Sequence, residues 1–574
     1  MRRLAQGLLV ALALGIVARP LLHREVFTFR DHTDYFQPLR WFTATALKSG
    51  QLPLWNPYSA SGEPWLANPQ TAVFYPPAWL FLVLPFETAY MLFLALHLAL
   101  LGCGALLLFS RRASLGAATI GAVALMLCGP TLSLLDVQNN LTTFAWLPLV
   151  IWCAAARAPA MASAAAIAMS FLAGEPFFAA VGALIFTIVR RRDVIDIAAQ
   201  SFALAAVQLV PFLAMLRGSD RVGAAPAEVL REAMPLFDWL RVAVPPSVSA
   251  SGFDAALGQH FIPIVYVGVI ATALALAGAI FAWRRLGGWL ALLAVAIVFS
   301  TAQGAALLAH LPLALFRYPA RLVPLGALAI AAMAVEGWDV LARIARSRWL
   351  AILVAAAIAV ELLSFTRPLL VTAPMDRQHI VPYVPAVGRD AKFVRLGDPR
   401  RIATDRRAWI GGYLNLYEHR FDVWTAAPLV SRRYEELYER AIGDRSLSVL
   451  SSMSAGYLIT ERGLFRNLRA RPLAYAGNAA PSLLAFGPRF IHAVIELPAP
   501  STLIVTQQNS TGWSVDVDGR RAPMVEGGDF LAVQLPPGKH DVLWRYRSVP
   551  LIAGAVLTLL AIARMLLPKK FVKR

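Results

Sequence analysis

Long apolar runs recur along the chain, separated by short basic clusters, and this pattern constrains the fold more than any other feature. About 20 apolar residues are needed to cross the hydrocarbon core of a bilayer. Of the 574 residues, 58% are hydrophobic and only 15% are charged, whereas a soluble protein carries about 25% charged residues. The sequence therefore predicts a polytopic α-helical membrane protein that lies in the lipid bilayer.

The basic clusters predict a topology, because cytoplasmic loops are enriched in Lys and Arg. With a cytoplasmic N-terminus, each cluster falls on the inner side of about twelve transmembrane helices. The first run is short enough for a cleaved signal peptide, but an uncleaved helix is favoured because the chain that follows it is itself membrane-embedded. The predicted helices cover residues 4–22, 87–110, 114–129, 141–156, 160–173, 176–189, 195–216, 262–283, 287–300, 322–342, 349–366 and 549–567.

Outside the membrane, the sequence predicts one long loop and one soluble domain. Residues 1–366 form a transmembrane domain whose first external loop covers residues 23–76. Residues 367–548 form an extracytoplasmic domain of mixed α/β structure, and residues 549–574 form the last helix and a basic cytoplasmic tail.

The last part of the extracytoplasmic domain, from about residue 481, alternates apolar and polar residues as antiparallel strands do. Asp518-Gly519 is a strong tight-turn signal between two of these strands. The turn explains Asp516-Val-Asp518 better than a nucleotide-sugar site does, although the spacing mimics the DxD motif of nucleotide-sugar enzymes. We expect a small β-sandwich-like module with strands at residues 502–506, 513–517, 531–535 and 542–546.

The external loop contains an unusual stretch, residues 50–77, that is rich in aromatic residues and amides and holds six prolines. Aromatic rings stack on sugar faces or lie at the membrane interface, and amide side chains offer donors and acceptors that suit sugar hydroxyls. Proline limits the entropy lost when such a loop is ordered. An interfacial aromatic belt explains the rings but explains the amides less well. The predicted sugar-binding residues are Trp55, Asn56, Tyr58, Asn68, Gln70 and Tyr75.

Two acidic residues, Asp31 and Asp34, follow the first predicted helix. An ionised carboxylate near a low-dielectric boundary is costly unless it is paired, so acids at such positions often have a function. Both are candidates for acid–base catalysis, or for holding a divalent metal such as Mg²⁺ or Mn²⁺, although no cofactor is required by the sequence. The alternative is a solvated loop that begins with two ordinary acids.

Three further charged residues lie at the predicted outer ends of helices. Arg317 and Arg321 flank Tyr318-Pro319, where guanidinium groups suit a phosphate at headgroup depth. Contacts to ordinary lipid headgroups explain the two arginines equally well. Glu175 interrupts an apolar hairpin, either as a substrate ligand or as a solvated turn residue.

Several functions find no support in the sequence. The net charge of +19 does not indicate nucleic-acid binding, because much of the basic charge lies in clusters at helix ends. The motifs GxxxxGK[ST], HExxH, GxSxG and GxGxxG are absent, so ATP-driven transport and zinc hydrolysis are not indicated. The three cysteines lie in apolar runs without a pair pattern, which argues against a disulfide framework.

The motifs follow one another in a recognisable order. An acid after the first helix is followed by Gly50-Gln-Leu-Pro-Leu-Trp-Asn-Pro-Tyr58, Gly62-Glu-Pro64, Ala67-Asn-Pro-Gln70, Phe74-Tyr-Pro-Pro77, Gly174-Glu-Pro176, Phe316-Arg-Tyr-Pro-Ala-Arg321 and Gly512-Trp513. This order resembles the YfhO-like bacterial membrane proteins of the C-class (GT-C) glycosyltransferase superfamily.

The resemblance implies an enzyme that moves a sugar from a polyprenyl-phosphate-linked donor to an extracytoplasmic acceptor, which is a cell-envelope glycan, a lipid or a protein. It implies that an acid in the first external loop is the catalytic base, a position that Asp31 occupies with Asp34 as the second acid. It also implies inversion of the anomeric centre, and the inner (cytoplasmic) membrane of a bacterium as the location.

Two other functions would use similar residues. A transporter or flippase of lipid-linked glycans would also need aromatic rings and arginines, but its polar groups would continue to the inner face, where the long helices are mostly Ala, Leu and Val. A non-catalytic envelope assembly protein would bind glycan through its C-terminal β module. That protein would not need Asp31 or Arg317.

Overall fold

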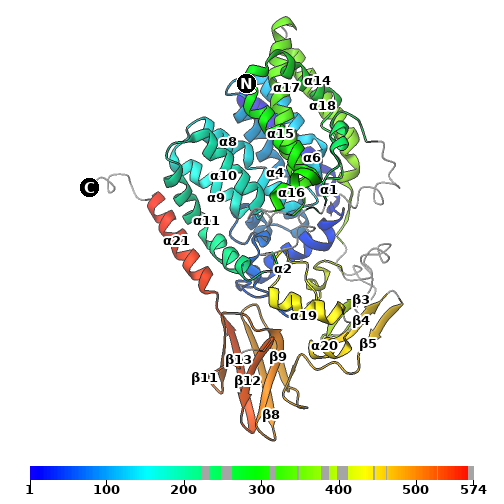
Figure 1. Ribbon diagram of the computed structural model, residues 1–574, viewed down its shortest axis with the longest axis vertical. Helices are drawn as coiled ribbons and strands as arrows, with labels where there is room; N and C mark the ends of the chain where they lie inside the picture. The colour runs from blue at the N-terminus through cyan, green and yellow to red at the C-terminus, as the bar shows by residue number, and fades with distance from the viewer. Residues whose placement is uncertain are drawn as a thin grey trace, which may run out of the picture.

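The chain forms a helical bundle at one end and a strand-rich C-terminal region at the other (Figure 1). Helix α19 lies between the bundle and the strands, and α21 returns from the strands along the side of the bundle. The computed structural model describes residues 1–221, 230, 232–246, 261–309, 317–345, 348–375, 387–396, 411–443, 446–460, 462–525 and 528–566. The predicted basic tail beyond residue 566 lies outside this part of the chain.

Within these residues, seven helical segments are long and apolar enough to cross a membrane. They correspond to α1 (Arg2–His23), α4 (Phe86–Phe109), α5 (Leu115–Leu127) with α6 (Gly129–Ser133), α11 (Val194–Arg217), α17 (Val323–Ala345), α18 (Arg348–Thr366) and α21 (Val549–Leu566). Four shorter apolar helices accompany them: α9 (Ala160–Leu172), α10 (Pro176–Arg190), α14 (Val269–Phe281) and α15 (Gly287–Ser300). The predicted multi-pass helical class is confirmed, whereas twelve full-length spans are not.

Two predicted spans differ from the structure for physical reasons. The span predicted at residues 141–156 is divided into α7 (Gln138–Phe144) and α8 (Leu147–Ala155). Pro148 lies in the first turn of α8, where its missing N–H breaks no helical hydrogen bond but prevents one continuous helix. The span predicted at residues 262–283 begins only at α14, because the preceding residues are extended and the Gly129 N–H donates to Tyr266 O at 2.8 Å.

Small residues allow the central helices to approach closely. Helix α5 packs against α4, α17 and α18 and is the most buried of the candidate spans. Where α14 crosses α17, a Cβ added at Gly337 would lie 1.9 Å from Leu274 O, and one added at Gly278 would lie 2.3 Å from Met333 O. Such contacts hold membrane helices together, because lipid offers no hydrophobic driving force between helices.

The loop after α1 is tied to the C-terminal region from its first residues. Strand β1 (Glu25–Phe27) pairs antiparallel with β2 (Thr372–Pro374), the first strand after α18. A π-helical turn (His32–Phe36) and the amphipathic α2 (Gln37–Lys48) follow β1. The loop leads into α3 (Leu80–Val83), where Val83 is exposed.

The C-terminal region has two parts. In the first, parallel strands β3 (Lys392–Leu396) and β4 (Ala455–Thr460) and the antiparallel β5 (Gly463–Arg466) form a sheet near α19 (Arg432–Gly443) and α20 (Leu447–Ser452). The second part is a sandwich of a five-stranded and a three-stranded sheet. Its strands are β6 (Ala474–Tyr475), β7 (Leu483–Phe486), β8 (Phe490–Leu497), β9 (Ser501–Gln508), β10 (Trp513–Val517), β11 (Arg520–Ala522), β12 (Phe530–Leu535) and β13 (Gly538–Tyr546).

The predicted strands and turn of the sandwich are confirmed. Residues from both sheets share one apolar core, in which Trp544 and Val505 are fully buried. Asp518 and Gly519 have φ angles of 50° and 79°, as a type I′ turn between β10 and β11 requires. The alternation of apolar residues therefore identified both the strands and their buried faces.

Candidate functional site

Asp31 lies directly beside a buried carboxylate that the sequence did not indicate. The Asp31 N–H donates to Asp136 Oδ1 at 2.8 Å, and Arg30 Nε pairs with Asp136 Oδ2 at 2.9 Å. Arg30 has a left-handed φ of 45°, a conformation that costs a non-glycine residue roughly 1–2 kcal/mol. The contacts of Asp136 with two successive residues hold this turn, and with it the position of Asp31 at the start of the π-helical turn.

The neighbouring histidine is a poor proton acceptor. His32 is fully buried, and its Nδ1 lies 2.7 Å from the Tyr90 hydroxyl. Burial lowers the pKa of His32 to about 3, far from the value near 7 that suits a general base at neutral pH. Of these two adjacent residues, Asp31 is therefore the better candidate base.

Asp34 is anchored to the C-terminal region through its backbone. Asp34 O accepts a hydrogen bond from the Tyr413 N–H at 2.7 Å. At Gly412, which has a φ of 57°, an added Cβ would lie 2.0 Å from the same oxygen. A glycine is therefore required where the two segments touch, and the C-terminal region helps to position the acidic turn.

The two acids do not form a complete metal site by themselves. Among the described residues, no group of three or more His, Cys, Asp and Glu side chains lies close enough to hold a metal ion. Asp31 and Asp34 are three residues apart, at the start of the π-helical turn and within it. Two carboxylates are a set with which Mg²⁺ is commonly bound when phosphate and water oxygens supply the other ligands.

A short polar segment, residues 136–140, lies buried in the bundle and connects the acidic turn to the arginines. Asp136 contacts the Asp31 turn, as described. Gln138 Oε1 accepts a hydrogen bond from Arg40 Nε at 3.1 Å, and Asn139 Nδ2 donates to Glu175 Oε2 at 2.8 Å. Buried polar groups are usually hydrogen-bonded, and these contacts supply partners to Asp136 and Asn139 and to one of the two polar atoms of Gln138.

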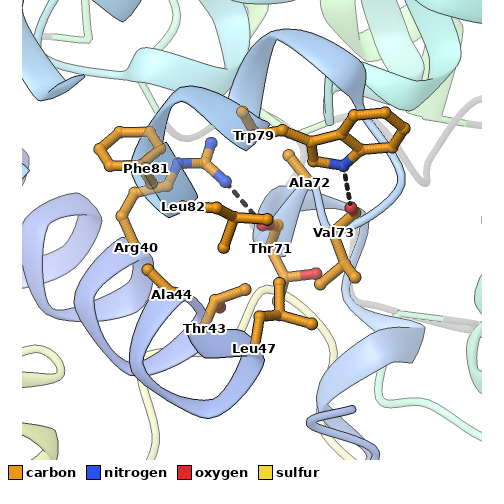
Figure 2. Close-up of a pocket in the computed structure, with 11 residues that line it drawn as sticks. Arg40, Thr43, Ala44, Leu47, Thr71, Ala72, Val73, Trp79, Phe81 and Leu82 are labelled. Carbon is orange, nitrogen blue, oxygen red and sulfur yellow. Dashed lines mark hydrogen bonds between the residues drawn. The ribbon is translucent and has the colours of Figure 1, made fainter. Parts of the chain in front are cut away.

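Arg40 is a buried cation at the floor of this site. Only 2% of the residue is exposed, and it lies over the Phe93 ring at 5.4 Å. Its Nη1 donates to Thr71 O at 2.7 Å in a small pocket behind Trp79 (Figure 2). No carboxylate of the described residues pairs with Arg40, and burial lowers its pKa to about 10. An unpaired buried guanidinium favours negative charge nearby.

Glu175 and Arg321 form an ion pair at the other end of the polar segment. Arg321 Nη1 lies 3.1 Å from Glu175 Oε1, and the guanidinium lies 5.3 Å from the Phe261 ring and 5.2 Å from the Tyr318 ring. A Cβ added at Gly174 would lie 3.1 Å from Pro69 O. The Glu175 turn therefore packs directly on the 50–77 stretch.

Arg317 lies near Arg321 and belongs to a partly buried basic cluster. Its Nη2 is 3.6 Å from Asp220 Oδ2. Arg221, which follows in the chain, donates through Nε to Pro428 O at 2.8 Å. Burial lowers the pKa of Arg221, and the positive charge of Arg317 lowers it further. The cluster thus holds three guanidinium groups and two carboxylates, those of Glu175 and Asp220.

The structure does not present Trp55 as a sugar-stacking surface. Trp55 is fully buried in the core of the β-sandwich, with its ring edge-on to Trp513 at 5.1 Å. Its Nε1 donates to Gln507 Oε1 at 3.0 Å. The indole anchors the 50–77 stretch in the C-terminal region, because a buried Trp contributes a large apolar area and still needs a partner for its N–H.

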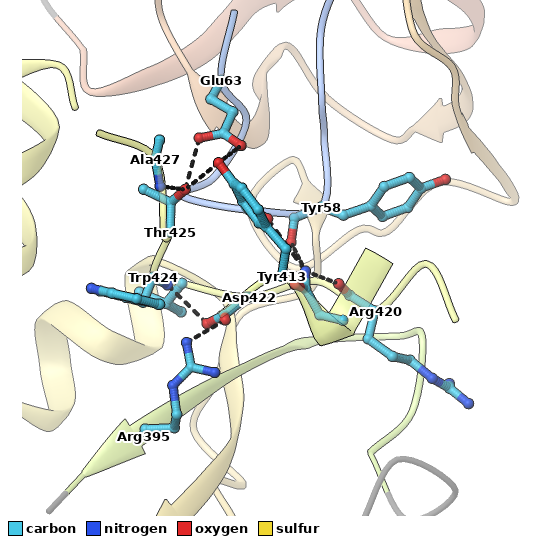
Figure 3. A network of polar contacts seen from close by, with 12 residues as sticks. Tyr58, Glu63, Arg395, Tyr413, Arg420, Asp422, Trp424, Thr425 and Ala427 are labelled. Atoms are coloured by element: carbon cyan, nitrogen blue, oxygen red, sulfur yellow. Dashed lines mark hydrogen bonds and ion pairs between the residues drawn. The ribbon is translucent and has the colours of Figure 1, made fainter. Parts of the chain in front are cut away.

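Asn56 and Tyr58 also take part in this anchoring. Asn56 Nδ2 donates to Glu63 Oε1 at 2.9 Å, and Tyr58 stacks on His419 at 4.8 Å. Glu63 Oε2 accepts from the Thr425 hydroxyl at 2.8 Å and Oε1 accepts from the Tyr413 hydroxyl at 3.1 Å (Figure 3). Burial raises the pKa of Glu63 to about 7.

The remaining predicted sugar-binding residues lie nearer the polar segment. Asn68 Oδ1 accepts from the Gln70 N–H at 3.0 Å, and Asn68 Nδ2 contacts the Tyr35 hydroxyl at 3.5 Å. Gln70 is half-buried. Tyr75 is fully buried, with its hydroxyl 2.7 Å from His97 Nε2. Of the predicted sugar-binding residues, Asn68 and Gln70 flank Pro69 in the chain, and Pro69 contacts the Glu175 turn.

Comparisons with known proteins give the following result. No protein-family model matches the chain, and no curated protein matches it. Among solved structures, it is similar to the arabinofuranosyltransferase AftD from Mycobacteria (TM-score 0.49, 16% identity, covering 96% of this chain and 40% of that chain). It is also similar to the archaeal oligosaccharyltransferase AglB from Archaeoglobus fulgidus (TM-score 0.42, 10% identity, covering 80% and 69%). This chain thus spans about two fifths of the length of AftD.

Proposed function

We propose that this chain is a membrane glycosyltransferase that moves a sugar from a polyprenyl-phosphate-linked donor to a hydroxyl acceptor outside the cytoplasm. The observation that carries the proposal is the buried segment 136–140. Through Asp136 it holds the acid Asp31, and through Asn139 it contacts the Glu175–Arg321 pair. A carboxylate and guanidinium groups on opposite sides of one polar segment suit group transfer from a phosphate to a hydroxyl.

Asp31 is the proposed base. Its carboxylate accepts the proton of the acceptor hydroxyl while that oxygen attacks the anomeric carbon, and the bond from the sugar to the lipid phosphate breaks. The electron pair of that bond leaves with the phosphate, so attack from the opposite face inverts the anomeric centre. General base catalysis typically contributes about 10²–10⁴-fold to the rate. Asp136 acts as a positioning residue, because it holds the backbone of Asp31.

Arg317 and Arg321 are the proposed partners of the departing lipid phosphate. Negative charge develops on that phosphate, and preoriented guanidinium groups stabilise it more strongly in a water-poor site than in bulk water. Their pairing with Asp220 and Glu175 fixes their orientation before substrate binds. Arg221 adds a third positive charge beside them.

A divalent metal is a second proposed source of positive charge. Asp31 and Asp34 are the residues that would hold Mg²⁺ or Mn²⁺, with phosphate and water oxygens as the other ligands. The metal would act as a Lewis acid on the phosphate. Asn68 and Gln70 are the amides proposed to bind sugar hydroxyls, whereas Trp55, Asn56, Tyr58 and Tyr75 support the loop that carries them.

The test is turnover of lipid-linked sugars by the purified protein. A panel of polyprenyl-phosphate sugars is offered with a hydroxyl acceptor, and release of the free lipid phosphate is followed with and without EDTA. We expect turnover by the wild type and at least a 100-fold loss in Asp31→Asn, with Asp518→Asn in the distant β-turn as the matched control. Full activity of folded Asp31→Asn would overturn the assignment of the base, and binding of donors without turnover would favour a transport or assembly role.

A further inference from the structure

An aliphatic groove runs along the membrane-facing side of the bundle, between α1 and the end of α18. Its volume is about 550 Å³. Both helices pack on α5, and the groove lies where they do not meet. It is lined by aliphatic residues such as Leu8, Leu12, Gly15, Leu363 and Leu370, and Arg367 is the one charged residue among those that line it.

Glycine keeps the groove open on the α1 side. A Cβ added at Gly15 would meet no heavy atom within 4 Å. The space beside this residue is therefore not filled by a neighbouring helix. In a bilayer, an apolar groove of this kind is filled by hydrocarbon, because contact between its apolar walls and water is unfavourable.

Two arginines lie at the same end of the groove. Arg367 follows α18 and is exposed, and no carboxylate of the described residues pairs with it. Leu8, Leu12 and Gly15 are spaced by four and three residues, so they share one face of α1. Arg19 lies four residues after Gly15 and continues this face, and within the described chain it too has no ion-pair partner.

The pairing of β1 with β2 shows that the C-terminal ends of α1 and α18 lie on the same side of the bundle. Strand β1 follows α1, β2 follows α18, and Phe27 lies opposite Thr372 in the register. From Leu8 to Arg19 is 11 residues, or about 16 Å of helix at 1.5 Å per residue. That is close to half of the roughly 30 Å hydrocarbon core, so the groove spans about one leaflet.

We propose that this groove binds an acyl chain of an anionic phospholipid, with Arg19 and Arg367 bound to its phosphate. Guanidinium groups bind phosphate oxygens in a bidentate manner. A groove that held only hydrocarbon would not require arginines at its end. The one-leaflet length fits an acyl chain, whereas a polyprenyl chain is much longer than one leaflet. None of the residues that line the groove belongs to the proposed sugar-transfer site, and lipid binding there does not depend on that function.

The charge of the headgroup gives the first test. The purified protein is titrated in detergent with phosphatidylglycerol or phosphatidylcholine of identical acyl chains, and bound lipid is counted by native mass spectrometry. Each arginine near an anionic headgroup contributes roughly fivefold to affinity. Phosphatidylcholine has a phosphate but no net charge, so the two arginines together give about a 25-fold preference for phosphatidylglycerol. The double variant Arg19→Gln, Arg367→Gln removes this preference, while Arg2→Gln at the other end of α1 leaves it unchanged.

The groove itself gives the second test. Gly15→Leu places a side chain on the groove face, where a Cβ meets no heavy atom within 4 Å, and weakens binding of both lipids at least tenfold. Gly288→Leu is the matched control, because a Cβ there also meets nothing within 4 Å and lies on another helix, α15. Equal binding of the two lipids, or wild-type binding by Gly15→Leu, would overturn the proposal. Tighter and arginine-dependent binding of a polyprenyl phosphate would replace the phospholipid with that carrier.

Discussion

Glu63 provides a test of how the external loop is joined to the C-terminal region. The carboxylate is 7% exposed and accepts hydrogen bonds from Asn56, Tyr413 and Thr425. Burial raises its pKa from 4.5 to about 7. Because the folded pKa lies above the unfolded one, the folded protein binds more protons between these pH values. The free energy of unfolding therefore falls as pH rises from about 4.5 to 7.

The magnitude follows from the size of this pKa change. A rise of about 2.5 in pKa corresponds to about 3 kcal/mol, since each unit is worth about 1.4 kcal/mol. Glu63→Gln keeps the shape but cannot ionise, so it removes this pH dependence. At pH 5 the two proteins should have similar stability, and at pH 8 the variant should be more stable by up to about 3 kcal/mol.

The assay is thermal unfolding of the wild type and Glu63→Gln, side by side from pH 5 to pH 8. For a unit of 150–250 residues, about 3 kcal/mol corresponds to a difference of roughly 6–12 °C in Tm. Burial raises the pKa of Asp422 to about 6, and the charge of Asp422 also raises the pKa of Glu63. The difference between the two proteins at each pH therefore reports Glu63 together with its interaction with Asp422. A Tm difference that stays constant across this pH range would show that Glu63 is ionised in the folded protein throughout, contrary to a raised pKa.

Three further outcomes follow from the site and the fold. Asp136→Asn should lower kcat at least tenfold with little change in KM, because it loosens the turn that holds Asp31; a steady-state assay checks this. Gly412→Ala should also lower turnover, because its Cβ would clash with the backbone of the acidic turn, while Gly443→Ala, in open space, should not. Trp55→Ala should destabilise the β-sandwich by about 3–5 kcal/mol, seen as an earlier unfolding transition, and an unchanged Tm would contradict its role as an anchor.

Periodicity was sufficient to predict the helical class and the strands of the sandwich. Apolar runs and alternation report burial directly. Asp518-Gly519 is a local turn signal, and both residues have the positive φ angles that the predicted turn requires. Twelve full-length spans are not confirmed among the described residues, because hydropathy alone does not separate a full crossing from a shorter apolar helix such as α14 or α15. The division of the span predicted at residues 141–156 was missed, because Pro148 lies within an apolar run that hydropathy alone reads as one helix.

The candidate site was only partly predictable. The acids and arginines were identified because charges near a membrane are costly, and the same rule applied to Asp136 and the following amides would have found the segment 136–140. The role of Trp55 was not accessible, since its partner Gln507 is 452 residues away in the chain. An exposed stacking surface and a buried anchor have the same local sequence, and only tertiary contacts distinguish them.

The central claim is that Asp31 is the base in a sugar transfer from a lipid phosphate. The most direct measurement is single-turnover release of the lipid phosphate from a bound donor by wild type and Asp31→Asn, with Asp518→Asn as the control and with folding of each checked by Tm. We expect release by the wild type and the control, and release at least 100-fold slower in Asp31→Asn. Release at the wild-type rate by Asp31→Asn would contradict it.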